Sequence, residues 1–113
     1  MKGQALKGHL DLLVLAVIAN GPLHGYAVIE QLRERSAEAF DLPEGTVYPV
    51  LHRLAGAGLL ASEWGESGGR RRRTYRLTDD GRSALVQQRS QWEQFTEAVT
   101  AVLKGAQPWP SPT

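Results

Sequence analysis

The strongest chemical signal in the sequence is a run of four consecutive arginines, Arg70–Arg73. A guanidinium group is always charged, and its fork of N–H donors matches the oxygens of a phosphate. Residues 45–78 carry six arginines against two glutamates, a net charge of +4, in a chain whose overall charge is only +1. Residues 1–44 and 79–113 are both net acidic. This concentration of basic charge indicates a polyanionic partner, and the alternative is an arginine-rich turn exposed to solvent.

The other reactive side chains do not form a recognisable catalytic or metal-binding pattern. The sequence has no cysteine, which excludes disulfides, thiolate catalysis and cysteine-based zinc sites. His9, His24 and His52 fall in three different expected helices, so we expect no metal site. The carboxylates and hydroxyls offer no spacing that would join a nucleophile, a base and an orienting group. We therefore expect no enzymatic activity and no cofactor.

The length of 113 residues corresponds to one domain, and a hydrophobic content of 42% is typical of a globular protein. The longest apolar stretch near the N-terminus, Leu12–Ala19, is far shorter than the roughly 20 residues of a membrane helix. The same region lacks the features of a signal peptide. We therefore expect a cytoplasmic protein that does not enter a membrane.

Apolar residues at helical spacing predict three helices in the first half of the chain. The first carries Leu6–Ile18 and ends at Asn20-Gly21-Pro22, and the second covers residues 24–37, with His24 at its start. The third follows Asp41-Leu42-Pro43 and turns four apolar residues inward, Val47, Val50, Leu51 and Leu54.

Pro49 conflicts with a regular third helix, because proline has no N–H and its ring clashes with the preceding turn. The conflict is smaller if Thr46 is the N-cap, since Pro49 would then lie in the first turn. The face opposite the apolar one carries an aromatic ring, an imidazole and glycines in place of ordinary solubilising residues.

Residues 59–64 and 73–77 predict two strands, joined by the glycine-rich segment 65–69. They form a β-hairpin with arginines at its tip, and we expect Trp64 to be buried at its base. Thr78 is the expected N-cap of a long last helix over residues 79–104. The proline-rich tail 105–113 is expected to be disordered.

Apolar residues of the last helix follow the a/d spacing of a coiled coil, which predicts a seam between two copies of the chain. The seam residues are Leu85, Trp92, Phe95, Val99 and Val102. Two interpretations of Trp92 stay open. It is an anchor of the dimer interface, or it forms with its symmetry mate the wall of a pocket for an aromatic ligand.

The order of these elements predicts a mainly α-helical protein with a small β-hairpin. The fold is a winged helix-turn-helix over residues 1–78 followed by a dimerisation helix over 79–104. The major groove of DNA admits one α-helix, while a basic hairpin suits adjacent phosphates or the minor groove. The third helix can present its polar face to DNA through Thr46, Tyr48, Pro49 and His52. The hairpin contributes Arg70, Arg71, Arg72 and Arg73.

Five short motifs occur in order along the chain: Leu23-His24-Gly25-Tyr26, the segment 44–54, Gly58-Leu59-Leu60, Gly68-Gly69 with the arginines that follow it, and the segment 75–81. Together they resemble the motifs of the PadR family of bacterial transcriptional regulators. The resemblance covers roughly residues 6–103, and the single last helix resembles the short subgroup of the family. The run of four arginines is denser than in a usual wing of this family.

The resemblance implies a homodimeric repressor that binds double-stranded DNA at a pseudo-palindromic operator, with Tyr26 on the DNA backbone. It also implies a small apolar or aromatic effector that releases the protein from DNA. Two alternatives differ in class. One is a protein-interaction module whose arginines bind an acidic partner, and the other is a small-molecule-binding protein with weak DNA binding. Steep salt dependence would distinguish DNA from an acidic protein.

Overall fold

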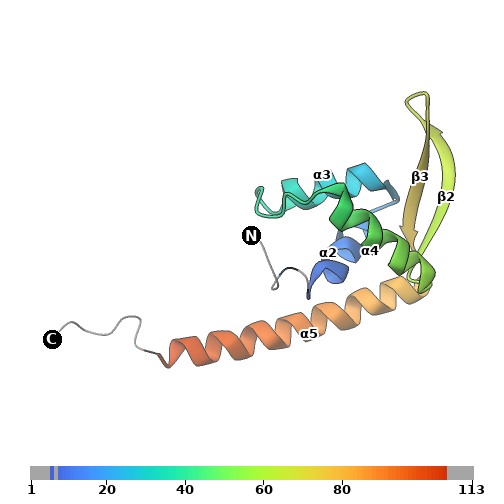
Figure 1. The fold of residues 1–113 in the computed structure, drawn as a ribbon. Helices are drawn as coiled ribbons and strands as arrows, with labels where there is room; N and C mark the ends of the chain where they lie inside the picture. Colours follow the sequence, from blue (N-terminus) through green and yellow to red (C-terminus); the bar gives the residue numbers. More distant parts are fainter. Residues whose placement is uncertain (1–5, 7, 107–113) are drawn as a thin grey trace.

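The computed structural model describes residue 6 and residues 8–106, except for the side chain of Ser67. A helical body carries a β-hairpin at one end and lies along one side of a long helix (Figure 1). The elements in chain order are α2 (Leu10–Ile18), β1 (Leu23–His24), α3 (Gly25–Arg35), α4 (Glu44–Gly56), β2 (Leu60–Ser67), β3 (Arg70–Leu77) and α5 (Asp79–Lys104). The mainly helical fold with a hairpin and a long C-terminal helix is confirmed.

The hydrophobic core lies where α2, α3 and α4 meet the base of the sheet. α2 is apolar on most sides because it lies between α5 and the other two helices (Figure 1). The four apolar residues predicted to face inward from the third helix are all buried in α4. The best-buried side chains come from all of these elements: Val14, Leu15, Ile18, Val28, Val47, Leu51, Leu54 and Leu60.

α4 directly follows Asp41-Leu42-Pro43, as the sequence predicts. It begins at Glu44 with Pro43 as its N-cap, three residues before the start that a Thr46 N-cap would give, and the Thr46 N–H donates to the Pro43 carbonyl at 3.0 Å. Pro49 therefore lies inside the helix and cannot donate to the carbonyl of Gly45. Thr46 is therefore not the N-cap, the arrangement in which Pro49 would conflict less with the helix, because Pro43 already gives the chain an extended entry and Glu44 suits the positive end of the helix.

Three antiparallel strands form the sheet, in the order β1-β3-β2. The sequence did not predict β1, a two-residue strand in which Leu23 pairs with Tyr75 and His24 with Thr74. This pairing fixes the start of α3 beside the middle of the hairpin, because α3 follows β1 without a break.

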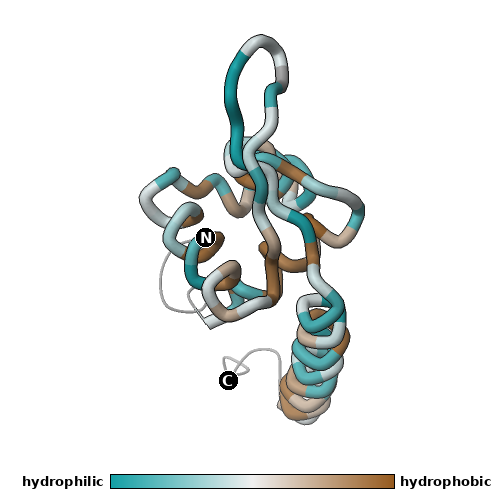
Figure 2. The backbone as a smooth tube through the Cα atoms, turned by 90° about the vertical axis from the view of Figure 1, so that its right-hand side faces the viewer, coloured by the Kyte–Doolittle hydropathy of each residue, from teal (hydrophilic) through white to brown (hydrophobic). Residues whose placement is uncertain are grey.

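The hairpin is longer than predicted. β2 and β3 pair over eight residues each and reach Ser67 and Arg70, so Arg70–Arg73 belong to a strand and not to the tip. The turn itself is Gly68-Gly69, with φ values of 59° and 75°, which suit the left-handed two-residue turn of a tight hairpin. Figure 2 shows hydrophilic residues in the outer part of the hairpin and hydrophobic ones at its base.

α5 begins at Asp79 with Thr78 as its N-cap, as predicted; the Thr78 Oγ1 accepts from the Gly81 N–H at 2.9 Å and donates to the Gly58 carbonyl at 2.7 Å. Gly81 is a close-packing site, because an added Cβ would lie 2.0 Å from the Leu59 carbonyl oxygen. At 1.5 Å per residue the helix is about 39 Å long. Its C-terminal half extends beyond the helical body (Figure 1). The tail predicted to be disordered lies, from residue 107 onward, outside the described residues.

Candidate nucleic-acid interface

An open cleft of about 990 Å³ separates α4 and the start of α3 from the hairpin. It brings together seven of the nine residues that the sequence predicted to contact DNA. The lining residues are His24, Gly25, Tyr26, Glu44, Tyr48, His52, Trp64, Arg70, Arg71, Arg72, Arg73 and Tyr75. Thr46 and Pro49 do not line this cleft; they lie on the exposed side of α4.

The exposed face of α4 carries few bulky side chains. Gly45, Pro49, His52 and Gly56 are spaced to form one stripe along the helix, and all four are exposed. Exposed Thr46 stands beside this stripe. Small residues allow a helix backbone to approach a flat surface closely, while the hydroxyl and the imidazole can form hydrogen bonds. This face fits a recognition helix that enters the major groove.

Tyr48 stands at the edge of that face and packs on the start of α3. A Cβ placed on Gly25 would lie 2.1 Å from Cε1 of Tyr48. The Tyr48 ring therefore occupies the position that a side chain at residue 25 would need, and only glycine fits there. Burial raises the pKa of Tyr48, and the nearby Glu44 carboxylate raises it further, while the Arg72 charge acts in the opposite direction. The hydroxyl is therefore protonated at neutral pH and can donate to an acceptor.

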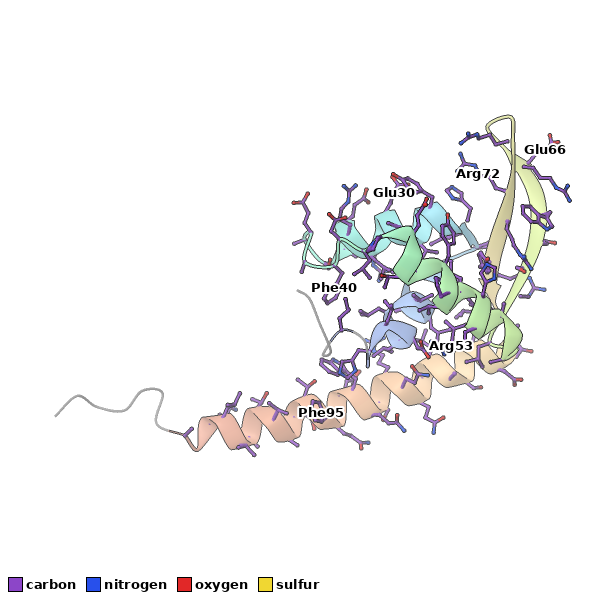
Figure 3. All side chains as sticks on the ribbon, in the orientation of Figure 1. Glu30, Phe40, Arg53, Glu66, Arg72 and Phe95 are labelled. Carbon is purple, nitrogen blue, oxygen red and sulfur yellow. The ribbon has the colours of Figure 1, made fainter. Side chains whose placement is uncertain are left out.

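The four arginines alternate between the two faces of β3, as in any strand. Arg71 and Arg73 share a face with Trp64, and their guanidinium carbons lie 5.0 and 5.7 Å from its ring centroid. Arg70 and Arg72 share the other face, and Figure 3 shows Arg72 on the side of the hairpin that faces α3. No carboxylate in the described part of the chain forms an ion pair with any of them. Their charges remain available to phosphates.

Trp64 is 56% exposed, so the prediction that it is buried at the base of the hairpin was wrong. The physical reason is the length of the hairpin. Trp64 pairs with Arg73, four register positions beyond the Leu60–Leu77 pair at the base. At that distance the hairpin extends beyond the helical body, so none of the described core residues packs on the indole. The indole contacts Arg71 and Arg73 instead.

His24 was expected to be a helix-start residue, and this is confirmed. Its Nδ1 accepts a hydrogen bond from the Ala27 N–H at 3.2 Å, which caps α3. Its place in the cleft was not predicted, because no local pattern connects it to the hairpin. Arg72 is 48 residues away in the chain, yet its Nη1 lies 3.0 Å from Nε2 of His24.

The predicted seam on α5 is mostly exposed in the single chain. Trp92, Phe95, Val99 and Val102 are exposed, whereas Leu85 packs against the core of its own chain. The Trp92 ring makes an edge contact with His9, with 4.7 Å between centroids, and lies 6.1 Å from Phe95. These three rings line a second, smaller cleft of about 440 Å³ between α5 and the start of α2.

The described residues contain no group of three or more histidine or acidic side chains arranged to hold a metal ion. Within the same residues, no helix is both long enough and apolar enough to cross a membrane.

Comparisons with known proteins agree with this geometry. Residues 14–87 match the family described as "Transcriptional regulator PadR-like family". The chain is 39% identical over 88 residues to the transcriptional regulator Rv3488 of Mycobacterium tuberculosis, which covers 78% of this chain and 79% of that protein.

Solved structures resemble the whole architecture. The crystal structure of a PadR family transcriptional regulator from Eggerthella lenta has a TM-score of 0.79 and 33% identity, covering 90% of this chain and 88% of the other. The PadR-like transcriptional regulator of Bacillus cereus has a TM-score of 0.81 and 28% identity, covering 92% of this chain and 100% of the other.

Proposed function

Because the chain belongs to the PadR-like family of transcriptional regulators, we propose that it acts as a homodimeric repressor of a pseudo-palindromic operator. As a member of that family, the chain is a DNA-binding transcriptional regulator. The observation that carries the proposal is the cleft in which Tyr48 and His52 of α4 face four arginines that have no carboxylate partner among the described residues.

In the proposed mode of binding, α4 enters the major groove and the hairpin follows the adjacent backbone. Thr46 and His52 supply hydrogen-bonding groups for base edges, and Pro49 contributes an apolar surface beside them. Tyr26, Tyr48 and the arginines contact phosphates, because they stand around the cleft and not on the outer stripe of α4. The arginines then supply most of the affinity, and α4 supplies the choice of sequence.

The proposed dimer forms through α5. The apolar seam residues Trp92, Phe95, Val99 and Val102 are left exposed by the described part of one chain, and a two-fold interface would bury both copies of the same surface. The pairing would also hold two copies of α4 at a fixed separation. Two half-sites one turn of DNA apart, about 34 Å, require such a separation.

A salt titration tests the DNA-binding role against the alternative of an acidic protein partner. The protein is titrated with a DNA duplex at several salt concentrations. For DNA, the logarithm of the association constant falls linearly with the logarithm of the salt concentration, because bound counterions are released. A shallow dependence, or no duplex binding at low salt, would contradict the proposal.

We further propose that the cleft beside Trp92 receives a flat apolar or aromatic effector between the two chains. The exposed indole and its contact with His9 support this role, because both rings can stack on such a ligand. A ligand that favours one dimer geometry weakens operator binding by about 1–3 kcal/mol, and the operator weakens ligand binding equally. Equal ligand affinities with and without operator DNA would contradict this role.

A further inference from the structure

We propose that His24 and Arg72 together bind one phosphate oxygen of the DNA backbone. The inference rests on the DNA-binding function proposed above and adds to it a residue whose evident role is to cap α3.

Two N–H donors compete for the ring of His24. The Ala27 N–H lies 3.2 Å from Nδ1, and the Arg72 guanidinium lies 3.0 Å from Nε2 and 3.4 Å from Nδ1. A neutral imidazole has one lone pair and one N–H, and a charged one has two N–H groups. The ring therefore cannot accept from both donors in either state.

The helix cap decides which nitrogen carries the proton. When Nδ1 accepts from Ala27, the proton of the neutral ring is on Nε2. The Nε2–H of His24 and the guanidinium of Arg72 are then two donors side by side with no acceptor between them. The opposite tautomer would accept from Arg72 but would lose the cap on α3. What the pair lacks is an acceptor from outside the chain.

The protein does not provide that acceptor within its described part. Arg72 has no carboxylate partner there, and Glu44, which lines the same cleft, forms no ion pair with it. The residue opposite Arg72 on β2 is Gly65, and a Cβ added to this glycine would meet nothing within 4 Å. The space beside the pair is open, so a ligand oxygen can reach it.

A DNA phosphate is the acceptor that this position favours. An anionic oxygen can accept from both donors at once, and a charge-assisted bond to a guanidinium is stronger than a neutral one. The pair lies between α4 and the hairpin, at the cleft that the backbone beside an occupied major groove would enter. One phosphate would then be bound by both the start of α3 and the hairpin, which fixes the hairpin relative to α3.

The test separates the cap from the phosphate contact. His24→Ser keeps a good N-cap but removes the ring N–H. The full-length protein and its variants are titrated with duplexes of about 30 base pairs and random sequence, long enough for two half-sites. We expect His24→Ser to keep the urea midpoint of the wild type and to weaken binding about 10- to 100-fold, the range for a hydrogen bond to a charged group. The slope of the salt dependence should not change, because a neutral group is removed.

A second variant and a matched pair of arginine variants complete the design. His24→Asp also caps the helix but places a negative charge beside the phosphate, so it should weaken binding more than His24→Ser. Arg72→Ala should remove most of the effect of His24→Ser, because both side chains hold the same oxygen. Arg70→Ala is the control, since Arg70 shares the strand face with Arg72 but, unlike Arg72, forms no hydrogen bond with His24 among the described residues. In the Arg70→Ala background, His24→Ser should weaken DNA binding by the same factor as in the wild type.

Three results would overturn the inference. A folded His24→Ser variant that binds within two-fold of the wild type would show that the ring is only a cap. If His24→Ser weakened DNA binding by the same factor in the Arg72→Ala and Arg70→Ala backgrounds, Arg72 would not be the specific partner of His24. Replacement of chloride by inorganic phosphate at constant ionic strength should leave the difference between wild type and His24→Ser in place; its disappearance would assign the site to free phosphate. Failure of the wild type to bind any duplex is a different outcome, which would reject the DNA-binding role itself.

Discussion

Asp11 of α2 and Arg53 of α4 form a two-pronged ion pair, with nitrogen–oxygen distances of 3.0 and 2.5 Å. Hydrogen bonding to the Asp11 carboxylate raises the pKa of Arg53. The same helix α2 begins next to His9, whose ring contacts Trp92 on α5. α2 therefore connects the surface proposed for dimerisation to the last turn of the proposed recognition helix. Figure 3 shows Arg53 at this position, beside α5.

The Asp11–Arg53 pair positions α4 and contributes little to stability. Both side chains are partly exposed, and exposed ion pairs contribute about 0–1 kcal/mol. Asp11→Asn should therefore lower the free energy of unfolding by less than about 1 kcal/mol, measured by urea denaturation. The exposed pair Arg89–Glu93 on α5 provides the control, since Glu93→Gln should have a similarly small effect. A loss several times larger for Asp11→Asn would mean that the pair holds the core together.

The contact between Gly25 and Tyr48 should be visible in a double-mutant cycle. Gly25→Ala places a methyl group inside the Tyr48 ring, so it should destabilise the protein by about 1–3 kcal/mol, as overpacking does. In the Tyr48→Ala background the ring is absent, and the same change should cost much less. Equal costs in both backgrounds, measured by thermal or urea unfolding, would place the effect in the backbone of α3 and not in this contact.

Dimerisation should depend on the middle of α5. The double change Trp92→Ala and Phe95→Ala removes the two largest exposed side chains of the seam, so it should give monomers or aggregates. Val86→Ala is the control, because Val86 is also exposed on α5 but lies off the seam spacing. Sedimentation at tens of micromolar distinguishes the species, and a monomeric wild type would contradict the proposed interface.

Substitutions in the hairpin and in α4 should have different effects on DNA binding. Arg71→Ala with Arg72→Ala should weaken binding to all duplexes alike and reduce the salt slope by about one for each lost phosphate contact. Replacement of Thr46 or His52 by alanine should change which sequences are preferred, by about 1–3 kcal/mol at the affected base pair. A change in sequence preference from the arginine variant, with an unaltered salt slope, would reverse these assignments.

Sequence patterns were sufficient for the helices because burial there follows a simple periodicity. The apolar spacing of Val47–Leu54 identified the inner face of α4, and Thr78 marked the start of α5. The strands of the outer hairpin were not predicted, because glycine and a run of arginines, as at Gly65 and Arg70–Arg72, are more typical of a turn than of a strand. Only pairing across the hairpin makes them strands. The two-residue strand β1 is too short to leave a pattern of its own.

The membership of the candidate site was predicted better than its geometry. Chemical type identified the arginines and the polar residues of α4, which are unusual on a helix surface. Contacts between residues far apart in the chain could not be predicted, because the local patterns of a single sequence do not show which distant residues meet. The approach of Arg72 to His24 depends on the pairing of β1 with β3, and the exposure of Trp64 depends on how far the hairpin extends beyond the core.

Selection of bound duplexes from a random pool tests the central claim most directly. If two copies of α4 read DNA from a dimer, the selected sequences should contain two inverted half-sites whose centres are about 10 base pairs, or one DNA turn, apart. The enrichment should be lost in the Trp92→Ala, Phe95→Ala variant, because its copies of α4 are no longer held together. Enrichment of a single unpaired motif, or no enrichment above the starting pool, would contradict the proposal of a dimeric, sequence-specific regulator.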